Sequence, residues 1–140
     1  FAQQKSLPLV LVGNWKNSDY GKLLQEEYSK HSHLHLLDPI YESSLLNQLR
    51  SNAKIYVHGH SEGGTNPSLV EAMYLGLPII SFDIIYNKVT TENQALYFQT
   101  SSELCEMLQD LQSFDLEKIS SWQGYVKVKV RNFYIRCYRI

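Results

Sequence analysis

The amino-acid sequence predicts an α/β fold in which a doubly wound parallel sheet carries helices on both faces. Short apolar segments alternate along the chain with longer segments whose apolar residues recur at helical spacing. Most of the apolar segments are continuous, which is typical of parallel strands buried on both faces. Crossover connections between parallel strands are right-handed, so this order of strands and helices predicts a doubly wound sheet.

Five segments have the composition of strands, and three of them end at Gly13, Pro39 or Gly59. In open α/β sheets, ligands bind beyond the carboxyl ends of the strands. The residues that follow each strand are therefore the first candidates for a binding site. The expected strands are residues 7–12, 33–37, 55–58, 77–82 and 95–98.

The expected helices are marked by capping residues and by apolar residues three or four positions apart. We expect Asp19 to cap the first helix, and Asn66, followed by Pro67, to cap the third. Gly76 is expected to end that third helix, and residues 101–103 to cap the next one. The expected helices are residues 19–29, 41–52, 67–75, 101–111 and 114–122.

Length and composition exclude several classes of protein. The chain has 140 residues, the size of one ordinary domain, and 44% of them are apolar, which excludes a disordered chain. No apolar run reaches the roughly 18 residues that a transmembrane helix needs. The net charge of −1 gives no reason to expect a nucleic-acid partner. Cys105 and Cys137 form no disulfide or metal-binding pattern, which favours a cytoplasmic location.

Residues 122–140 differ from the rest of the chain in charge. They hold five of the 13 basic residues and no acidic one, whereas the first 121 residues hold the other 8 basic and all 14 acidic residues. We therefore expect a domain at 1–121 and a basic tail at 122–140. Residues 125–131 alternate as an edge strand would. An altered C-terminus, an irregular extension, and an arm that binds nucleic acid or membrane are all compatible with this pattern.

The segment 57–73 carries the pattern with the clearest chemistry. Gly63 and Gly64 lie just before the helix that Asn66 is expected to cap. Free N–H groups at a helix N-terminus attract anions, and glycines let a phosphate approach the backbone closely. Neither a Gly-Lys-Ser/Thr sequence nor a GxGxxG sequence is present. The residues themselves fit either a phosphate site or an ordinary glycine turn before a capped helix.

The sequence around these glycines resembles a known family. Residues 63–73 and 76–80 resemble the C-terminal, donor-binding domain of GT-B-fold retaining glycosyltransferases of the group 1, family 4 type. The Gly-Gly-Thr-Asn-Pro-Ser sequence is similar to that of bacterial rhamnosyltransferases, which act in polysaccharide biosynthesis. The resemblance covers about residues 7–111 and implies a Rossmann-like half of a GT-B fold. Supporting matches lie at residues 11–13, 36–41 and 96–98.

The resemblance implies a set of donor-binding residues, while it identifies no catalytic residue. Glu71 would accept hydrogen bonds from the ribose hydroxyls, a role that suits a carboxylate facing a vicinal diol. The glycine segment would meet the diphosphate or the donor sugar, and His58 or His60 would lie near that sugar. Ile40 and Tyr41 would lie against the base, and Gly13 would leave room near the phosphates. The full set is Gly13, Ile40, Tyr41, His58, Gly63, Gly64, Thr65, Asn66 and Glu71.

The sequence departs from the family's pattern at one carboxylate. Many members carry two glutamates separated by seven residues, and counting back from Glu71 gives Gly63, with Glu62 displaced by one position. The strand with the basic residues that bind the diphosphate, and the acceptor-binding lobe, are expected to lie outside this sequence. We therefore expect the fragment to bind a nucleotide and to transfer no sugar by itself.

The resemblance also implies the partners. The donor would be a dTDP-, UDP- or GDP-sugar, and the acceptor a glycan or a lipid-linked glycan bound through the missing lobe. The expected location is the cytoplasm, or the inner face of the cell membrane for the full-length enzyme. We expect no cofactor and no metal, because no Cys or carboxylate spacing completes a site with the alternating His31, His33 and His35.

Two other functions remain open at this point. One is the equivalent lobe of a GT-B-fold epimerase or phosphorylase, which would share the sheet. The other is a flavodoxin-like binding or signalling module without catalysis of its own. A binding screen with nucleoside diphosphates and their sugars distinguishes these hypotheses.

Overall fold

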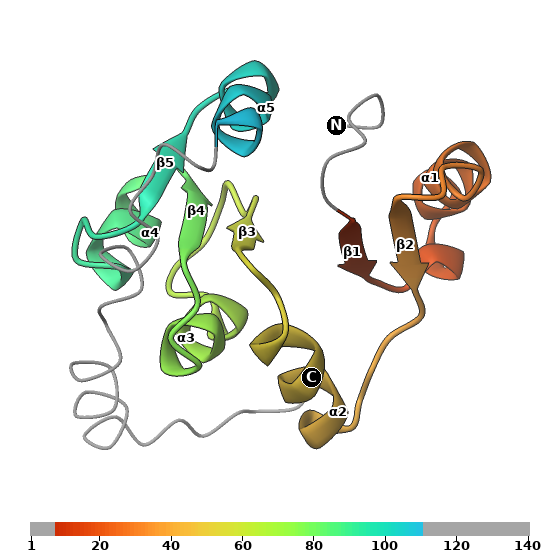
Figure 1. Cartoon of the computed structure of the whole chain (residues 1–140), viewed down its shortest axis with the longest axis horizontal. Coiled ribbons are helices and arrows are strands. Elements are labelled where there is room, and N and C mark those ends of the chain that lie inside the picture. Colours follow the sequence, from red (N-terminus) through yellow and green to blue (C-terminus); the bar gives the residue numbers. More distant parts are fainter. Residues whose placement is uncertain (1–7, 111–140) are drawn as a thin grey trace. The chain divides into compact units, whose positions relative to one another are not determined.

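The computed structural model describes residues 8–110, in which strands and helices alternate along the chain (Figure 1). These residues fall into two compact units, one up to Leu46 and one from Asn47 onward. The expected helix at 114–122 and the basic tail at 122–140 lie outside the described residues.

The first unit contains a two-stranded parallel sheet. In it, β1 (Leu9–Val12) pairs with β2 (Leu34–Leu37), so that Leu9 faces Leu34 and Val12 faces Leu37. A short 3₁₀ turn, η1 (Trp15–Asn17), and the helix α1 (Asp19–Tyr28) connect the two strands. The connection between them runs through a helix, as parallel pairing requires.

The second unit contains a three-stranded parallel sheet in the order β3, β4, β5. Its strands are β3 (Tyr56–His58), β4 (Ile79–Phe82) and β5 (Leu96–Phe98). Their carboxyl ends lie at one edge of the sheet, because all of the pairs are parallel. The chain passes through α3 (Pro67–Tyr74) and α4 (Ile85–Thr90) between these strands, and α5 (Ser101–Gln109) follows β5. The helix α2 (Ser43–Ser51) contains the boundary between the two units.

The hydrophobic core of the second unit lies under α3. Leu69, Ala72 and Met73 occupy positions i, i+3 and i+4 of this helix and pack with residues of the sheet and its connections. Leu69 and Ala72 are completely buried. This packing fixes the orientation of α3, and its N-terminus with it, relative to β3. The buried partners of the helix are Leu77, Ile79 and Ala95.

The structure confirms the predicted α/β class, with parallel strands flanked by helices. All five strands end at the predicted residue and begin one or two residues later than predicted. Glycine and proline fix the ends of several strands, whereas the first residues of a strand pair less regularly. The strands form two hydrogen-bonded sheets among the described residues, of two and three strands.

Two of the predicted helix caps are wrong by one residue. Ser18, not Asp19, caps α1, because the backbone N–H of Gly21 donates to its hydroxyl at 3.0 Å. Thr100 caps α5 in the same way, by accepting from the N–H of Glu103 at 3.2 Å. In each case a hydroxyl residue directly precedes the residue that was predicted.

Helix α4 has no counterpart among the helices expected from the sequence. This helix has six residues, includes the β-branched Ile85, Val89 and Thr90, and has no side-chain cap at Ile84. Such a segment has weak intrinsic helix propensity. Its stability comes from tertiary contacts, since Asn87 is buried within it.

Candidate functional site

The glycine loop, defined as residues 59–66, connects β3 to α3 at the carboxyl edge of the second sheet. Gly63 has a φ of +82°, a conformation that favours glycine over any residue with a Cβ. A Cβ built on Gly64 would meet no atom within 4 Å. The backbone at Gly64 is therefore accessible to a ligand from the side where a side chain would otherwise project.

Asn66 caps α3 as predicted. Its Oδ1 accepts a hydrogen bond from the backbone N–H of Ser68 at 2.9 Å, and Pro67 is the first residue of the helix. Gly76 has a φ of +72° just beyond the last turn, so it ends the helix as predicted. Only Thr65 and Asn66 separate the two glycines from the first residue of α3, whose positive dipole end lies toward the loop.

Glu71 forms an ion pair that the sequence did not reveal. Its Oε2 lies 2.6 Å from Nη1 of Arg50, at the end of α2. The Arg50 side chain is only 12% exposed, while that of Glu71 is 43% exposed. The carboxylate is therefore held from its buried side and reaches solvent on the other. No local pattern marks Arg50, because its partner is 21 residues away in the chain.

Tyr56 lies beside this ion pair. Burial raises the pKa of the Tyr56 phenol above its usual value, against the opposing effects of Arg50 and of a hydrogen bond with Ser68. The negative charge of Glu71 also raises this pKa. The phenol is therefore neutral at physiological pH and is close enough to the ion pair for both charges to act on its pKa.

His58 is a buried residue at the end of β3. Its side chain is 4% exposed, and its Nε2 has no hydrogen-bond partner among residues 8–110. Burial lowers the pKa of His58, and the nearby His60 lowers it further. The imidazole is therefore neutral near pH 7. Its ring lies 6.0 Å from that of His60 and stacks 6.0 Å from that of Tyr56, measured between centroids.

A family model described as "Glycosyl transferases group 1" matches residues 1–102 of the chain. The chain belongs to this family. The match includes the glycine loop, α3 and both parallel sheets. Comparison with curated proteins gives no match. Membership of the group 1 glycosyltransferases accounts for the Rossmann-like arrangement and indicates glycosyl transfer from a nucleotide-sugar donor to a glycan acceptor.

The first unit of this glycosyltransferase holds three of the predicted site residues. Gly13 follows β1 and donates its N–H to the carbonyl of Leu37 at 3.1 Å. A Cβ on Gly13 would lie 3.5 Å from the ring of Trp15, so the glycine is packed. Tyr41 is 84% exposed and Ile40 is partly buried. The roles of these residues toward a base or a phosphate stay predictions.

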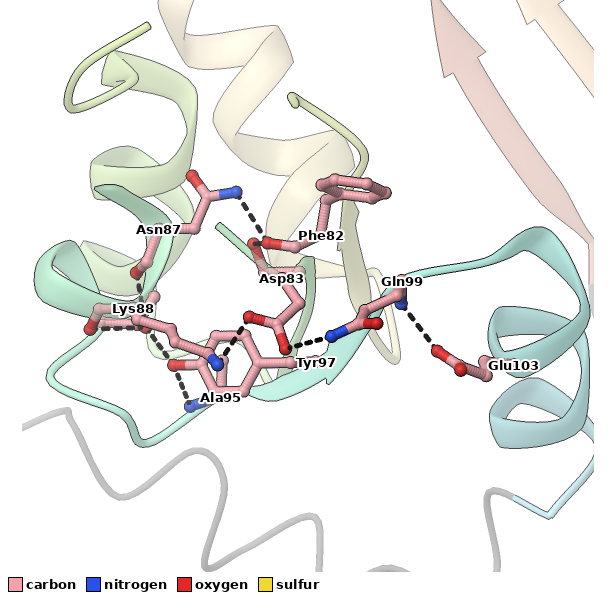
Figure 2. A network of polar contacts seen from close by, with 10 residues as sticks. Phe82, Asp83, Asn87, Lys88, Ala95, Tyr97, Gln99 and Glu103 are labelled. Atoms are coloured by element: carbon pink, nitrogen blue, oxygen red, sulfur yellow. Dashed lines mark hydrogen bonds and ion pairs between the residues drawn. The ribbon is translucent and has the colours of Figure 1, made fainter. Parts of the chain in front are cut away.

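A second group of polar residues lies at the carboxyl ends of β4 and β5 in the glycosyltransferase (Figure 2). Asp83 forms an ion pair with Lys88 and accepts a hydrogen bond from Nε2 of Gln99 at 3.2 Å. These hydrogen bonds lower the pKa of Asp83. Lys88 also lies over the ring of Tyr97, 5.4 Å from its centroid. This network satisfies its own charges and ties α4 to both strand ends.

Residues 8–110 of the glycosyltransferase hold neither a cluster of metal ligands nor a membrane-spanning helix. No three His, Cys, Asp or Glu side chains converge there as metal ligands would. No helix in this part of the chain has both the length and the apolar character needed to cross a membrane.

Proposed function

We propose that the chain is the donor-binding lobe of a retaining glycosyltransferase and that its glycine loop binds the diphosphate of a sugar nucleotide. The observation that carries this proposal is the geometry of the loop. Gly63 turns the backbone in the left-handed region, Gly64 leaves its approach open, and the capped N-terminus of α3 follows at once. The positive end of the α3 dipole favours an anion at such a place.

Glu71 is proposed to bind the ribose. Arg50 holds one carboxylate oxygen, Oε2. The other oxygen, Oε1, is then the acceptor for a ribose hydroxyl, through a charge-assisted hydrogen bond. In this arrangement Arg50 orients the carboxylate through Oε2, and Oε1 faces the ribose.

The proposed reaction retains the configuration of the sugar. The acceptor hydroxyl attacks the anomeric carbon on the face from which the diphosphate leaves, and the charge that develops on the diphosphate is stabilised electrostatically. Helix N-termini provide such stabilisation without any proton transfer. The resemblance supports a deoxyhexose such as rhamnose as the sugar, carried by dTDP, UDP or GDP, and a polysaccharide or lipid-linked glycan as the acceptor. We place the enzyme in the cytoplasm or at the inner face of the membrane.

We also propose that these 140 residues transfer no sugar by themselves, because the resemblance assigns the acceptor to a separate lobe. Closure of the two lobes would exclude water and align the reactants.

Calorimetric titration with dTDP, UDP and GDP tests the proposal. We expect at least one of them to bind, and its monophosphate to bind more weakly because the glycine loop contacts the second phosphate. Inorganic phosphate at the same concentration controls for anion binding without a nucleoside. Failure of all three diphosphates to bind would overturn the proposed function.

A further inference from the structure

The glycine loop is attached to α4 at both of its ends. Near its start, the carbonyl oxygen of His60 accepts a hydrogen bond from Nδ2 of Asn87 at 3.0 Å. Near its end, the hydroxyl of Thr65 lies 3.3 Å from that of Thr90. Residues 59–65 are all exposed, so burial contributes little to the conformation of the loop.

Asn87 is placed to define the conformation of the loop. Its side chain is 1% exposed, and its amide nitrogen donates to the carbonyl of Phe82, at the end of β4, as well as to that of His60, each at 3.0 Å. Figure 2 shows this amide directed toward the end of β4. A primary amide has two N–H donors, and here each donor meets one backbone carbonyl. The two carbonyls therefore lie a fixed distance apart, and the loop starts from a fixed point.

The contact at the other end has a defined direction. The Thr90 hydroxyl donates to the carbonyl of Tyr86 at 2.8 Å, so its proton is already committed. The Thr65 hydroxyl is then the donor in the contact with Thr90, and its oxygen keeps its lone pairs free to accept. Both attachments come from one short helix.

We infer that Asn87 is a positioning residue for the glycine loop and that Thr90 has the same role at the loop's other end. The inference rests on the proposed function, since it gives the loop's fixed conformation a purpose in binding the diphosphate. A loop with two adjacent glycines has many conformations in the absence of such contacts. Apparent affinity falls in proportion to the fraction of molecules whose loop is in the binding conformation.

The test compares loop order and nucleotide affinity in four variants. Asn87→Asp has nearly the same shape but loses both donors, and Thr90→Val loses the hydroxyl that accepts from Thr65. Thr90→Ser keeps that hydroxyl. Thr91→Val is the matched control, because Thr91 is a buried residue that bonds to the carbonyl of Asn87 and to Tyr97, and not to the loop.

Nitrogen-15 relaxation gives order parameters for the backbone N–H groups of residues 59–66, and calorimetry gives Kd for dTDP, UDP and GDP. We expect Asn87→Asp and Thr90→Val to lower these order parameters from about 0.85 toward 0.6, values that separate rigid from flexible backbone. The nucleoside diphosphate that binds the wild type should bind these two variants about tenfold more weakly, which corresponds to a loop that is competent in one molecule in ten. Thr90→Ser keeps the hydroxyl, so its loop order parameters and its Kd should stay close to those of the wild type. Thr91→Val should lower the melting temperature while loop order and Kd stay unchanged.

The outcomes separate this inference from the function on which it rests. Unchanged order parameters in Thr90→Val and in folded Asn87→Asp would overturn the inference. If Asn87→Asp fails to fold, the comparison of Thr90→Val with Thr90→Ser decides in the same way. A loop that loosens in the variants of a protein that binds none of the three diphosphates supports the positioning role and overturns the donor function.

Discussion

At the scale of single residues, Glu71 and Glu62 compete for the role of the donor-binding carboxylate. We expect Glu71→Ala to weaken donor affinity about 10- to 150-fold, because it removes a charge-assisted interaction of about 1.5–3 kcal/mol. Glu62→Ala is the matched control and should change affinity little, since Glu62 is an exposed residue of the glycine loop. Calorimetric titration with the nucleoside diphosphate that binds the wild type measures both. A greater loss in Glu62→Ala would move the ribose site to Glu62.

The variant at Glu71 also leaves Arg50 without its partner. The Arg50 side chain is largely buried, so an unpaired guanidinium there destabilises the fold. Donor affinity is therefore measured well below the melting temperature of each variant.

The two glycines of the loop should respond differently to a side chain. Gly64→Val should abolish nucleoside diphosphate binding with little change in stability, because its side chain enters open space where the phosphate would lie. Gly63→Ala should instead cost about 1–2 kcal/mol of stability, since the residue has a positive φ. Thermal denaturation and calorimetric titration measure the two effects. Unchanged nucleotide affinity in Gly64→Val would place the phosphate elsewhere.

His58 should make the stability of the fold depend on pH. Its pKa is lower in the folded state than its ordinary value of 6.5, so between these two values the unfolded chain binds more protons. The contribution of His58 to stability is then fully present above pH 6.5 and is lost as pH falls toward the lowered pKa. Melting temperatures between pH 7.5 and 5 test this, and His58→Gln should show a smaller decrease across that range. An equal decrease in both proteins would contradict the assignment.

At the scale of elements, the cap of α5 serves as the control for the cap of α3. Asn66→Ala and Thr100→Ala should each cost about 1 kcal/mol of stability, because each removes a side-chain acceptor at a helix N-terminus. Asn66→Asp keeps the cap, but it should weaken nucleoside diphosphate binding through repulsion of the phosphates. Thr100→Ala should leave this affinity unchanged. Equal nucleotide binding by Asn66→Asp and the wild type would exclude an anion at the N-terminus of α3.

The elements that could be predicted from the sequence are those with local signals. The range of α3 was predicted to within one residue, because Asn66, Pro67 and Gly76 mark its two ends. Helix α4 has no such marks, and its position depends on the burial of Asn87.

The candidate site was predictable for the same reason only in part. The glycine loop and Glu71 belong to one continuous motif. Arg50 and Asn87 act on that motif from 21 and 27 residues away, through contacts that only the folded chain makes. Patterns within a short window of sequence contain no information about such partners.

At the scale of the whole molecule, we expect nucleotide binding without sugar transfer. We expect the 140-residue chain to bind a nucleoside diphosphate and to transfer no sugar when it is incubated with dTDP-, UDP- or GDP-sugars and a glycan acceptor. The physical reason is that alignment of donor and acceptor requires both substrates to be held at once. Chromatography of the products measures transfer. Sugar transferred by the chain alone would contradict the proposal that donor and acceptor are bound by separate lobes.

The attachment of the glycine loop to α4 also works in the opposite direction. If α4 favours the loop conformation that binds a nucleotide, then by thermodynamic reciprocity a bound nucleotide stabilises α4 by the same free energy. The amides of residues 85–90 would then exchange their hydrogens more slowly when the loop is occupied. This short helix would serve as a built-in reporter of donor occupancy, readable without a label on the ligand or on any residue proposed to touch it.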